Sequence, residues 1–118
     1  MRTLFTVTAL LMTLAGSPAA HAHAFLDHAS PLVGSTVASA PSEVALTFTQ
    51  NLEPAFSTVT VTGPGGADIG QGKAQVSGNT MRIGIKGGGA GTYRVHWHAL
   101  SVDTHTTEGT FTFHVGGK

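Results

Sequence analysis

One residue near the start of the chain and two near its end could together hold a metal ion. His23 is the residue that an export peptidase would leave at the start of the chain, where its α-amine and ring nitrogen could chelate one metal. Asp103 and His105 supply a carboxylate and a second imidazole near the other end. Three nitrogens and one oxygen in a tetragonal plane suit Cu(II), which also leads the affinity order of first-row divalent metals. The residues therefore predict a Cu(II) site, although Zn(II) accepts similar ligands in a tetrahedron.

The case for His23 depends on the first 22 residues, which have the form of a signal peptide. A positively charged start and an apolar run over residues 3–14, too short to span a membrane, lead to a small-x-small cleavage motif that ends at Ala22. Cleavage there frees an α-amine with a pKa of about 7.7–8.0, whose proton a metal can displace near neutral pH. Cleavage after Ala20 is the alternative. His23 could also be no more than the point at which the peptidase cuts.

Asp103 and His105 lie in a polar connection, Leu100–Glu108, between the last two expected strands. In extended backbone, side chains two residues apart share a face, so both could reach one ion. Each also has an explanation without a metal, because a loop Asp commonly accepts turn hydrogen bonds and a neighbouring His can face solvent. The combination with His23 is what favours a metal site.

Composition narrows the classes of function. Removal of 22 residues from a chain of 118 leaves 96, enough for one small domain with one core. The remaining chain has five Lys and Arg against six acidic residues, a formal charge of −1, so no nucleic-acid partner is expected. No later apolar run is long enough to cross a bilayer, so we expect no membrane insertion of the mature chain. The lack of Cys excludes a disulfide scaffold and a thiolate metal site, including blue copper.

Short alternating segments separated by Gly, Pro and Ser predict an all-β domain. The clearest strands are expected at residues 43–48, 58–62, 80–85, 92–99 and 109–115. The glycine-rich segments 63–72 and 87–91 are expected to be turns. About seven short strands without a helix or a repeat favour an antiparallel β-sandwich or barrel. The expected core consists of Phe48, Val59, Val61, Met81, Ile83, Ile85, Tyr93, Val95, Trp97, Phe111, Phe113 and Val115.

The other histidines have simpler interpretations. His96 and His98 share the outward face of their expected strand, where such a pair could bind a metal weakly but more often forms a solvated surface. His28 is considered as a hydrogen-bond partner for the ring of His23, a role that is not favoured. His114 is expected to be an exposed strand residue.

Several segments resemble the CopC family of periplasmic copper-resistance proteins, over essentially the whole mature length. They are His23-Ala24-Phe25-Leu26 with Ser30-Pro31, Leu46-Thr47-Phe48 with Glu53-Pro54-Ala55-Phe56-Ser57, Gly91-Thr92-Tyr93-Arg94-Val95-His96-Trp97, and Ser101-x-Asp103-x-His105-x-x-x-Gly109. The resemblance implies a Greek-key β-sandwich, cupredoxin-like or Ig-like, over residues 23–118. It also implies that Cu(II) is bound by the amine and ring of His23, with Asp103 and His105.

The same resemblance implies a periplasmic protein, cleaved after Ala22, that is not an enzyme. Its role would be copper buffering, copper resistance or delivery of copper to an inner-membrane copper transport protein. The sequence departs from the family pattern at Thr104, where the family usually has Gly. Because Thr resists positive φ, the loop backbone is expected to differ there. The mature chain keeps only Met81, which is expected in the core, so we expect no methionine-rich Cu(I) site.

Two other functions stay open. Lytic polysaccharide monooxygenases also hold copper with an N-terminal His chelate, but they use a second His in place of an Asp-x-His pair. They also present a broad glycan-binding surface, for which one Trp and one Tyr offer little area. The alternatives are therefore a copper-dependent oxidase with an N-terminal His chelate, or a metal-free sandwich module in which the three residues are a coincidence.

Overall fold

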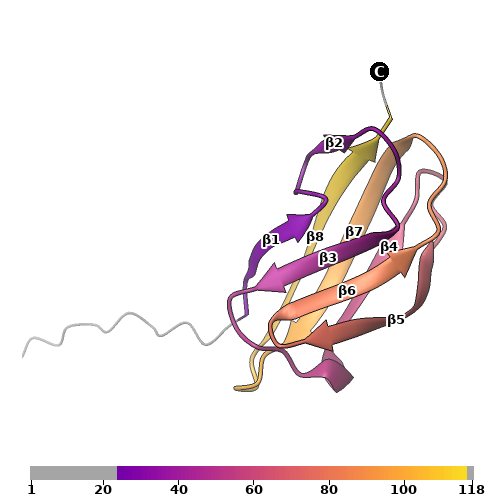
Figure 1. The fold of residues 1–118 in the computed structure, drawn as a ribbon. Coiled ribbons are helices and arrows are strands. Elements are labelled where there is room, and N and C mark those ends of the chain that lie inside the picture. Colours follow the sequence, from indigo (N-terminus) through magenta and orange to yellow (C-terminus); the bar gives the residue numbers. More distant parts are fainter. Residues whose placement is uncertain (1–23, 117–118) are drawn as a thin grey trace, which may run out of the picture.

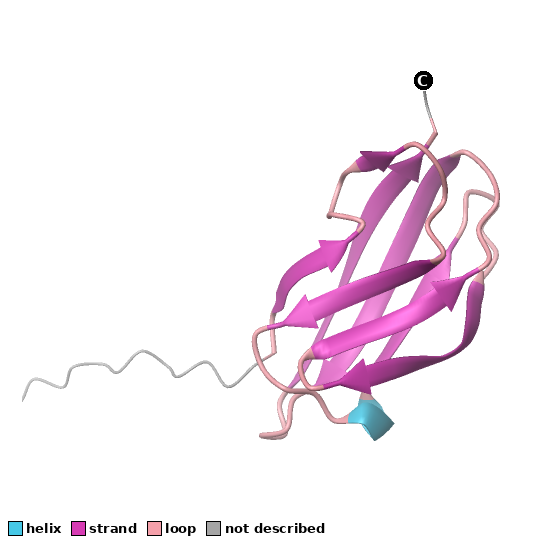
Figure 2. Ribbon diagram, viewed as in Figure 1, coloured by secondary structure: helices cyan, strands magenta, loops and turns pink. Residues whose placement is uncertain are grey.

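The protein forms a sandwich of two four-stranded β-sheets. Figures 1 and 2 show how the two layers face each other. The computed structural model describes residues 24–116, so the expected signal peptide and His23 lie outside the described residues. One sheet has the order β1 (Leu26–Ser30), β3 (Glu43–Phe48), β6 (Thr80–Ile85), β5 (Gly70–Ser77). The other has the order β2 (Thr36–Val37), β8 (Thr106–Val115), β7 (Gly91–Leu100), β4 (Thr58–Thr62). A 3-10 turn, η1 (Pro54–Phe56), precedes β4.

The chain changes sheet at every step from β1 to β5 and again between β6 and β7. Such crossings between layers are the Greek-key connections of β-sandwiches. Neighbouring strands are antiparallel except β2, which runs parallel to β8. The expected all-β sandwich is confirmed, with eight strands in the described chain where about seven were expected. No helix among residues 24–116 has the length and apolar character needed to cross a membrane.

The core lies between the sheets and contains all twelve of the expected residues. Phe48 meets Trp97 edge to face, with ring centroids 5.1 Å apart, and Tyr93 stacks on Phe113 at the same separation. Such aromatic pairs contribute about 0.5–1.5 kcal/mol beyond the burial of their area. Met81 is fully buried, as expected of a core residue. The inward face of each strand is thus set by its period-2 pattern.

The structure corrects the expectation that the whole of residues 63–72 is a turn. β5 begins at Gly70 and pairs with β6, with a register shift between Gln71 and Gln75. Gly72 lies in that shift with a φ of +77°. A β-bulge of this kind uses the positive φ that glycine adopts without a steric penalty. The glycines therefore belong to an irregular edge strand, whose weak alternation hid it from the sequence.

The longest ladder joins β7 to β8 and places the connection between them. Ten residue pairs run from Gly91–Val115 to Leu100–Thr106. The connection is therefore residues 101–105, shorter than the expected Leu100–Glu108. A short connection at the end of a long, fully paired ladder leaves little freedom for the residues within it.

Gly109 of β8 is in contact with the ring of Trp97, and we expect an added methyl group there to destabilise the sandwich. A Cβ at Gly109 would lie 2.6 Å from Trp97 Cζ2 and 2.9 Å from Cε2. Overpacking of a rigid ring should make Gly109→Ala less stable by about 1–3 kcal/mol. The matched control is Gly65→Ala, because a Cβ at Gly65 meets nothing within 4 Å.

Chemical denaturation, followed by the fluorescence of the single Trp, measures both variants. Equal stability of the Gly109→Ala and Gly65→Ala proteins would contradict the packing described for Trp97.

Candidate metal centre

The β7–β8 connection is a tight turn closed by two backbone hydrogen bonds. Ser101 N donates to His105 O at 2.9 Å, and Thr104 N donates to Ser101 O at 2.8 Å. Thr104 has a φ of +74°, in the left-handed region. A turn hydrogen bond followed by a left-handed residue is the usual geometry of a three-residue hairpin loop, and glycine fits the left-handed position best. Thr104 therefore adopts a positive φ in spite of its β-branched side chain, and the expected difference from the family backbone stays a prediction.

Asp103 and His105 come together on this turn. Asp103 Oδ1 lies 3.7 Å from His105 Nδ1, and the two side chains are 43% and 49% exposed. Two ligands that each lie about 2.0–2.2 Å from one metal ion can be no more than about 4.4 Å apart. The pair satisfies that limit. Their proximity was predicted on the basis of an extended backbone, whereas the residue between them, Thr104, has a left-handed conformation.

The carboxylate of Asp103 is held in its ionised form by its surroundings. The Ser101 hydroxyl donates to Asp103 Oδ1 and is the main reason that the pKa of Asp103 lies below its usual value. Desolvation is the second-largest effect and raises the pKa of Asp103, whereas the Asp103 backbone amide and the neighbouring His105 each lower it by less. Ser101 itself has no exposed surface. A buried hydroxyl thus fixes an exposed carboxylate in the state that a metal ligand requires.

The turn is also tied to the segment before η1. Val102 N donates to Asn51 O at 3.0 Å, Glu53 N donates to Leu100 O at 2.8 Å, and Leu52 forms a β-bridge with Ser101. Leu52 is buried and anchors this segment in the core. The loop that carries the candidate ligands is therefore supported from the side as well as by its own ladder.

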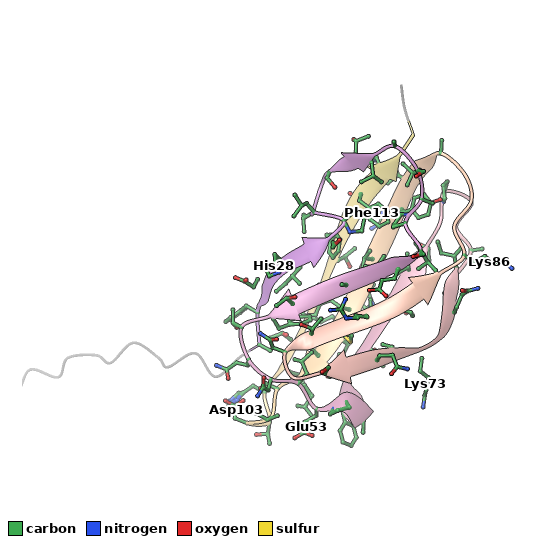
Figure 3. All side chains as sticks on the ribbon, viewed as in Figure 1. His28, Glu53, Lys73, Lys86, Asp103 and Phe113 are labelled. Atoms are coloured by element: carbon green, nitrogen blue, oxygen red, sulfur yellow. The ribbon has the colours of Figure 1, made fainter. Side chains whose placement is uncertain are left out.

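The first described residues lie against the strand that leaves this turn. Thr107 Oγ1 donates to Ala24 O at 2.7 Å, and Thr107 is two residues beyond His105. Ala24 has no exposed surface, and Phe25 and Thr49 exchange two further hydrogen bonds, of 3.0 and 2.9 Å. Figure 3 shows Asp103 at the end of the sandwich where the described chain begins. The residue before Ala24, His23, is the expected ligand that lies outside the described range.

Within residues 24–116, no three His, Cys, Asp or Glu side chains are arranged to hold a metal ion. Asp103 and His105 are thus a pair of potential ligands in the described part of the chain. Sequence reasoning missed the roles of Ser101 and Thr107. Both are small hydroxyl residues close to the turn, and both continue the odd-numbered, inward-facing positions of β7 and β8. That pattern is the signal that could have found them.

Two of the other histidines have partners on their own sheets. His28 Nδ1 lies 2.8 Å from Asp27 Oδ2, so its ring pairs with a neighbour in β1. His114 Nδ1 lies 3.0 Å from Thr92 Oγ1 across the β7–β8 ladder, and His114 is half-buried where an exposed residue was expected. Neither residue is brought into contact with Asp103 or His105.

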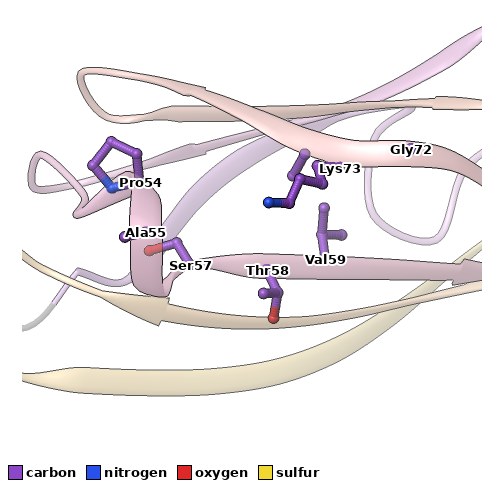
Figure 4. Close-up of a pocket in the computed structure, with 8 residues that line it drawn as sticks. Pro54, Ala55, Ser57, Thr58, Val59, Gly72 and Lys73 are labelled. Atoms are coloured by element: carbon purple, nitrogen blue, oxygen red, sulfur yellow. The ribbon is translucent and has the colours of Figure 1, made fainter.

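A cavity of about 340 Å³ opens between β4 and β5, beside η1 (Figure 4). Pro54, Ser57 and Lys73 are among the residues that line it, and Asp103 and His105 are not. Lys73 is its one charged lining residue. The cavity is therefore separate from the candidate metal centre and offers no metal-ligand set.

Comparison with known proteins identifies the family to which a chain with this fold and this turn belongs. Residues 26–116 match the CopC domain family, and the chain therefore belongs to the CopC family. Protein YobA of Escherichia coli strain K12 is 35% identical over 121 residues, which cover 97% of this chain and 95% of that protein. Copper resistance protein C of Xanthomonas campestris pv. juglandis is 32% identical and covers 97% of this chain and 96% of its own length. These matches confirm the family expected from the sequence.

A solved structure and a larger protein extend the comparison. CopC from Methylosinus trichosporium OB3b superimposes with a TM-score of 0.72 at 30% identity, over 79% of this chain and 93% of that chain. Copper transport protein CutJ of Bacillus subtilis is 28% identical over 80% of this chain, but the match spans only 18% of CutJ. A domain similar to this one therefore forms a small part of CutJ.

The left-handed backbone at Thr104 predicts a stabilising substitution. An L-residue pays about 1–2 kcal/mol for this conformation, whereas glycine adopts it freely. The greater freedom of glycine in the unfolded chain offsets part of the gain, so Thr104→Gly should stabilise the protein by about 0.5–1 kcal/mol.

The matched control is Thr106→Gly, an exposed residue in the extended backbone of β8, which should destabilise by about 0.5–1 kcal/mol. Urea denaturation of both variants measures the difference. Loss of stability in Thr104→Gly would show that the threonine side chain contributes more than the backbone strain costs.

Proposed function

We propose that this chain is a periplasmic protein that binds Cu(II) and buffers it or passes it to an inner-membrane copper transport protein, without catalysing a reaction. One observation carries the proposal: Asp103 and His105 lie 3.7 Å apart on a supported turn, and Ala24 is bonded to Thr107 just beyond it. The carboxylate, the imidazole and Ala24, the first described residue, thus lie at one end of the sandwich.

The covalent link between His23 and Ala24 is the basis for the two further ligands that we assign. Consecutive Cα atoms are about 3.8 Å apart, so a chain that begins at His23 starts one residue from the anchored Ala24. We assign the α-amine and the ring of His23 as the two further nitrogens, with Asp103 and His105 as the other ligands. Signal-peptide cleavage after Ala22 is what would create this amine, so the proposal includes cleavage at that bond.

The donor set supports Cu(II) as the occupant. Three nitrogens and one carboxylate oxygen match the ligand preference of Cu(II), whereas Cu(I) prefers thiolate and thioether sulfur. The chain has no Cys, and Met81 is fully buried in the core. Because both described ligands are about half exposed, another protein could approach the metal directly.

Family membership supports the role in copper handling. The CopC family includes proteins named for copper resistance, and one relative is a copper transport protein of which a similar domain forms a small part. That arrangement supports delivery of copper to a membrane transport protein. The export signal in the first 22 residues supports the periplasm as the location.

A comparison of two proteins tests the amine as a ligand. One begins at His23, and the other carries Gly-Ser-Gly-Ser ahead of it, so that the free amine is moved away while every side chain is kept. Cu(II) is titrated against a competing chelator, with electron paramagnetic resonance as the second readout. We expect one tightly bound ion in the first protein and an affinity more than about a hundredfold weaker in the second, since even an outer partner of a metal ligand is worth about 10–100-fold.

His105→Gln in the protein that begins at His23 is the matched side-chain variant and should weaken binding in the same way. His114→Gln, which removes a histidine paired with Thr92, should leave binding unchanged. Equal affinity of the native-start and extended proteins would overturn the assignment of His23.

A further inference from the structure

The outer face of the β7–β8 sheet carries a second group of potential metal ligands. His96 and His98 alternate with the buried Val95, Trp97 and Ala99, so both point away from the core. The sequence predicted that outward face and favoured a solvated surface for the pair. The structure adds a third residue that the sequence did not indicate, a carboxylate from the neighbouring strand.

That carboxylate belongs to Glu108 of β8. In the ladder Glu108 is directly opposite His98, while its Oε2 lies 2.8 Å from His96 Nε2. Residues directly opposite in a ladder have Cβ atoms about 4.5–5.5 Å apart. Glu108 therefore stands across from one imidazole and in contact with the other, and the side chains of His96 and Glu108 are 47% and 61% exposed.

The spacing suits a shared metal ion. Two ligands that are each about 2.0–2.1 Å from a metal are separated by about 2.9 Å at a right angle, as in the tetragonal plane of Cu(II), and by about 3.3–3.4 Å at the tetrahedral angle of Zn(II). His96 Nε2 and Glu108 Oε2, which share a hydrogen bond, lie 2.8 Å apart, close to the first value, and would have to move slightly apart to bind Zn(II). Two imidazoles and one glutamate form a ligand set that zinc proteins use, and imidazole also suits Cu(II).

This group is distinct from the candidate metal centre. Along β8, even-numbered residues such as Glu108 face outward, whereas odd-numbered Phe111 and Phe113 face the core. Thr107, which holds Ala24, shares the inward parity. Of the outward residues of β7, Arg94 is the cationic one, and it pairs with Thr112, on the far side of His96 from His98.

We propose that His96, His98 and Glu108 form a second, surface metal site for Zn(II) or Cu(II). In the described chain the three side chains are not yet arranged to hold an ion. Glu108 supplies the negative charge and is hydrogen-bonded to His96, and His98 completes the set only after a change of its side-chain torsions. Water molecules fill the other positions. Because the site is exposed and only partly preorganised, it binds more weakly than the site assigned to His23, Asp103 and His105, and it fills at higher metal concentration.

The test uses a background in which the first site is removed: the Gly-Ser-Gly-Ser-extended protein with His105→Gln. Zn(II) and Cu(II) are titrated separately by calorimetry, and the histidine ring signals are followed by NMR in the Zn(II) titration. We expect one saturable equivalent of metal, with shifts in the ring signals of His96 and His98. Binding of only one of the two metals would assign the site to that metal.

Three variants in this background identify the ligands. His96→Gln/His98→Gln should abolish the saturable equivalent, and Glu108→Gln and His98→Gln should each weaken it by about tenfold or more. His114→Gln, on the same sheet, is the matched control and should bind as the background does. Circular dichroism confirms that each variant is folded. Absence of binding in the background, binding that survives in the double variant, or an unchanged affinity in His98→Gln would overturn the three-ligand site.

Discussion

The ten-pair ladder between β7 and β8 is the constraint on which the rest of the molecule depends. Its inward face supplies the aromatic core, and its last pair, Leu100–Thr106, sets the start and end of the turn that carries Asp103 and His105. The first residue beyond that pair on β8, Thr107, holds the start of the described chain. The β7–β8 ladder thus positions the core, the candidate ligands and the first described residues relative to one another.

The β7–β8 turn contains one residue in a strained backbone conformation, and neighbouring hydrogen bonds hold that residue in place. Thr104 occupies a left-handed conformation that opposes its β-branched side chain, and the ladder on one side and the Asn51–Glu53 segment on the other hold it there. The buried Ser101 hydroxyl then orients the Asp103 carboxylate. The two candidate ligands are therefore held by backbone geometry that is present without a metal, which is what a selective site requires.

The sequence could predict the strands in which apolar and polar residues alternate regularly. Strands at 43–48, 58–62 and 80–85 alternate strongly, and their bounds agree with the structure. β5 and β2 could not be predicted, because an edge strand with a glycine bulge and a two-residue strand have too little pattern of their own. Their pairing is decided by distant residues that only the folded chain brings near.

The same division applies to the site. The Asp-x-His motif and the apolar faces are local features, so Asp103 and His105 could be chosen from sequence. The contacts that support them join residues far apart in the chain: Ala24 meets Thr107, and Leu52 forms a β-bridge with Ser101. Such contacts depend on register, which no single strand encodes.

The crystal structure of the Cu(II)-loaded protein that begins at His23 tests the central claim most directly. The account predicts copper bonded to the amine and ring of His23, to an Asp103 carboxylate oxygen and to the His105 ring. Copper bound without the His23 amine, or away from Asp103 and His105, would contradict it.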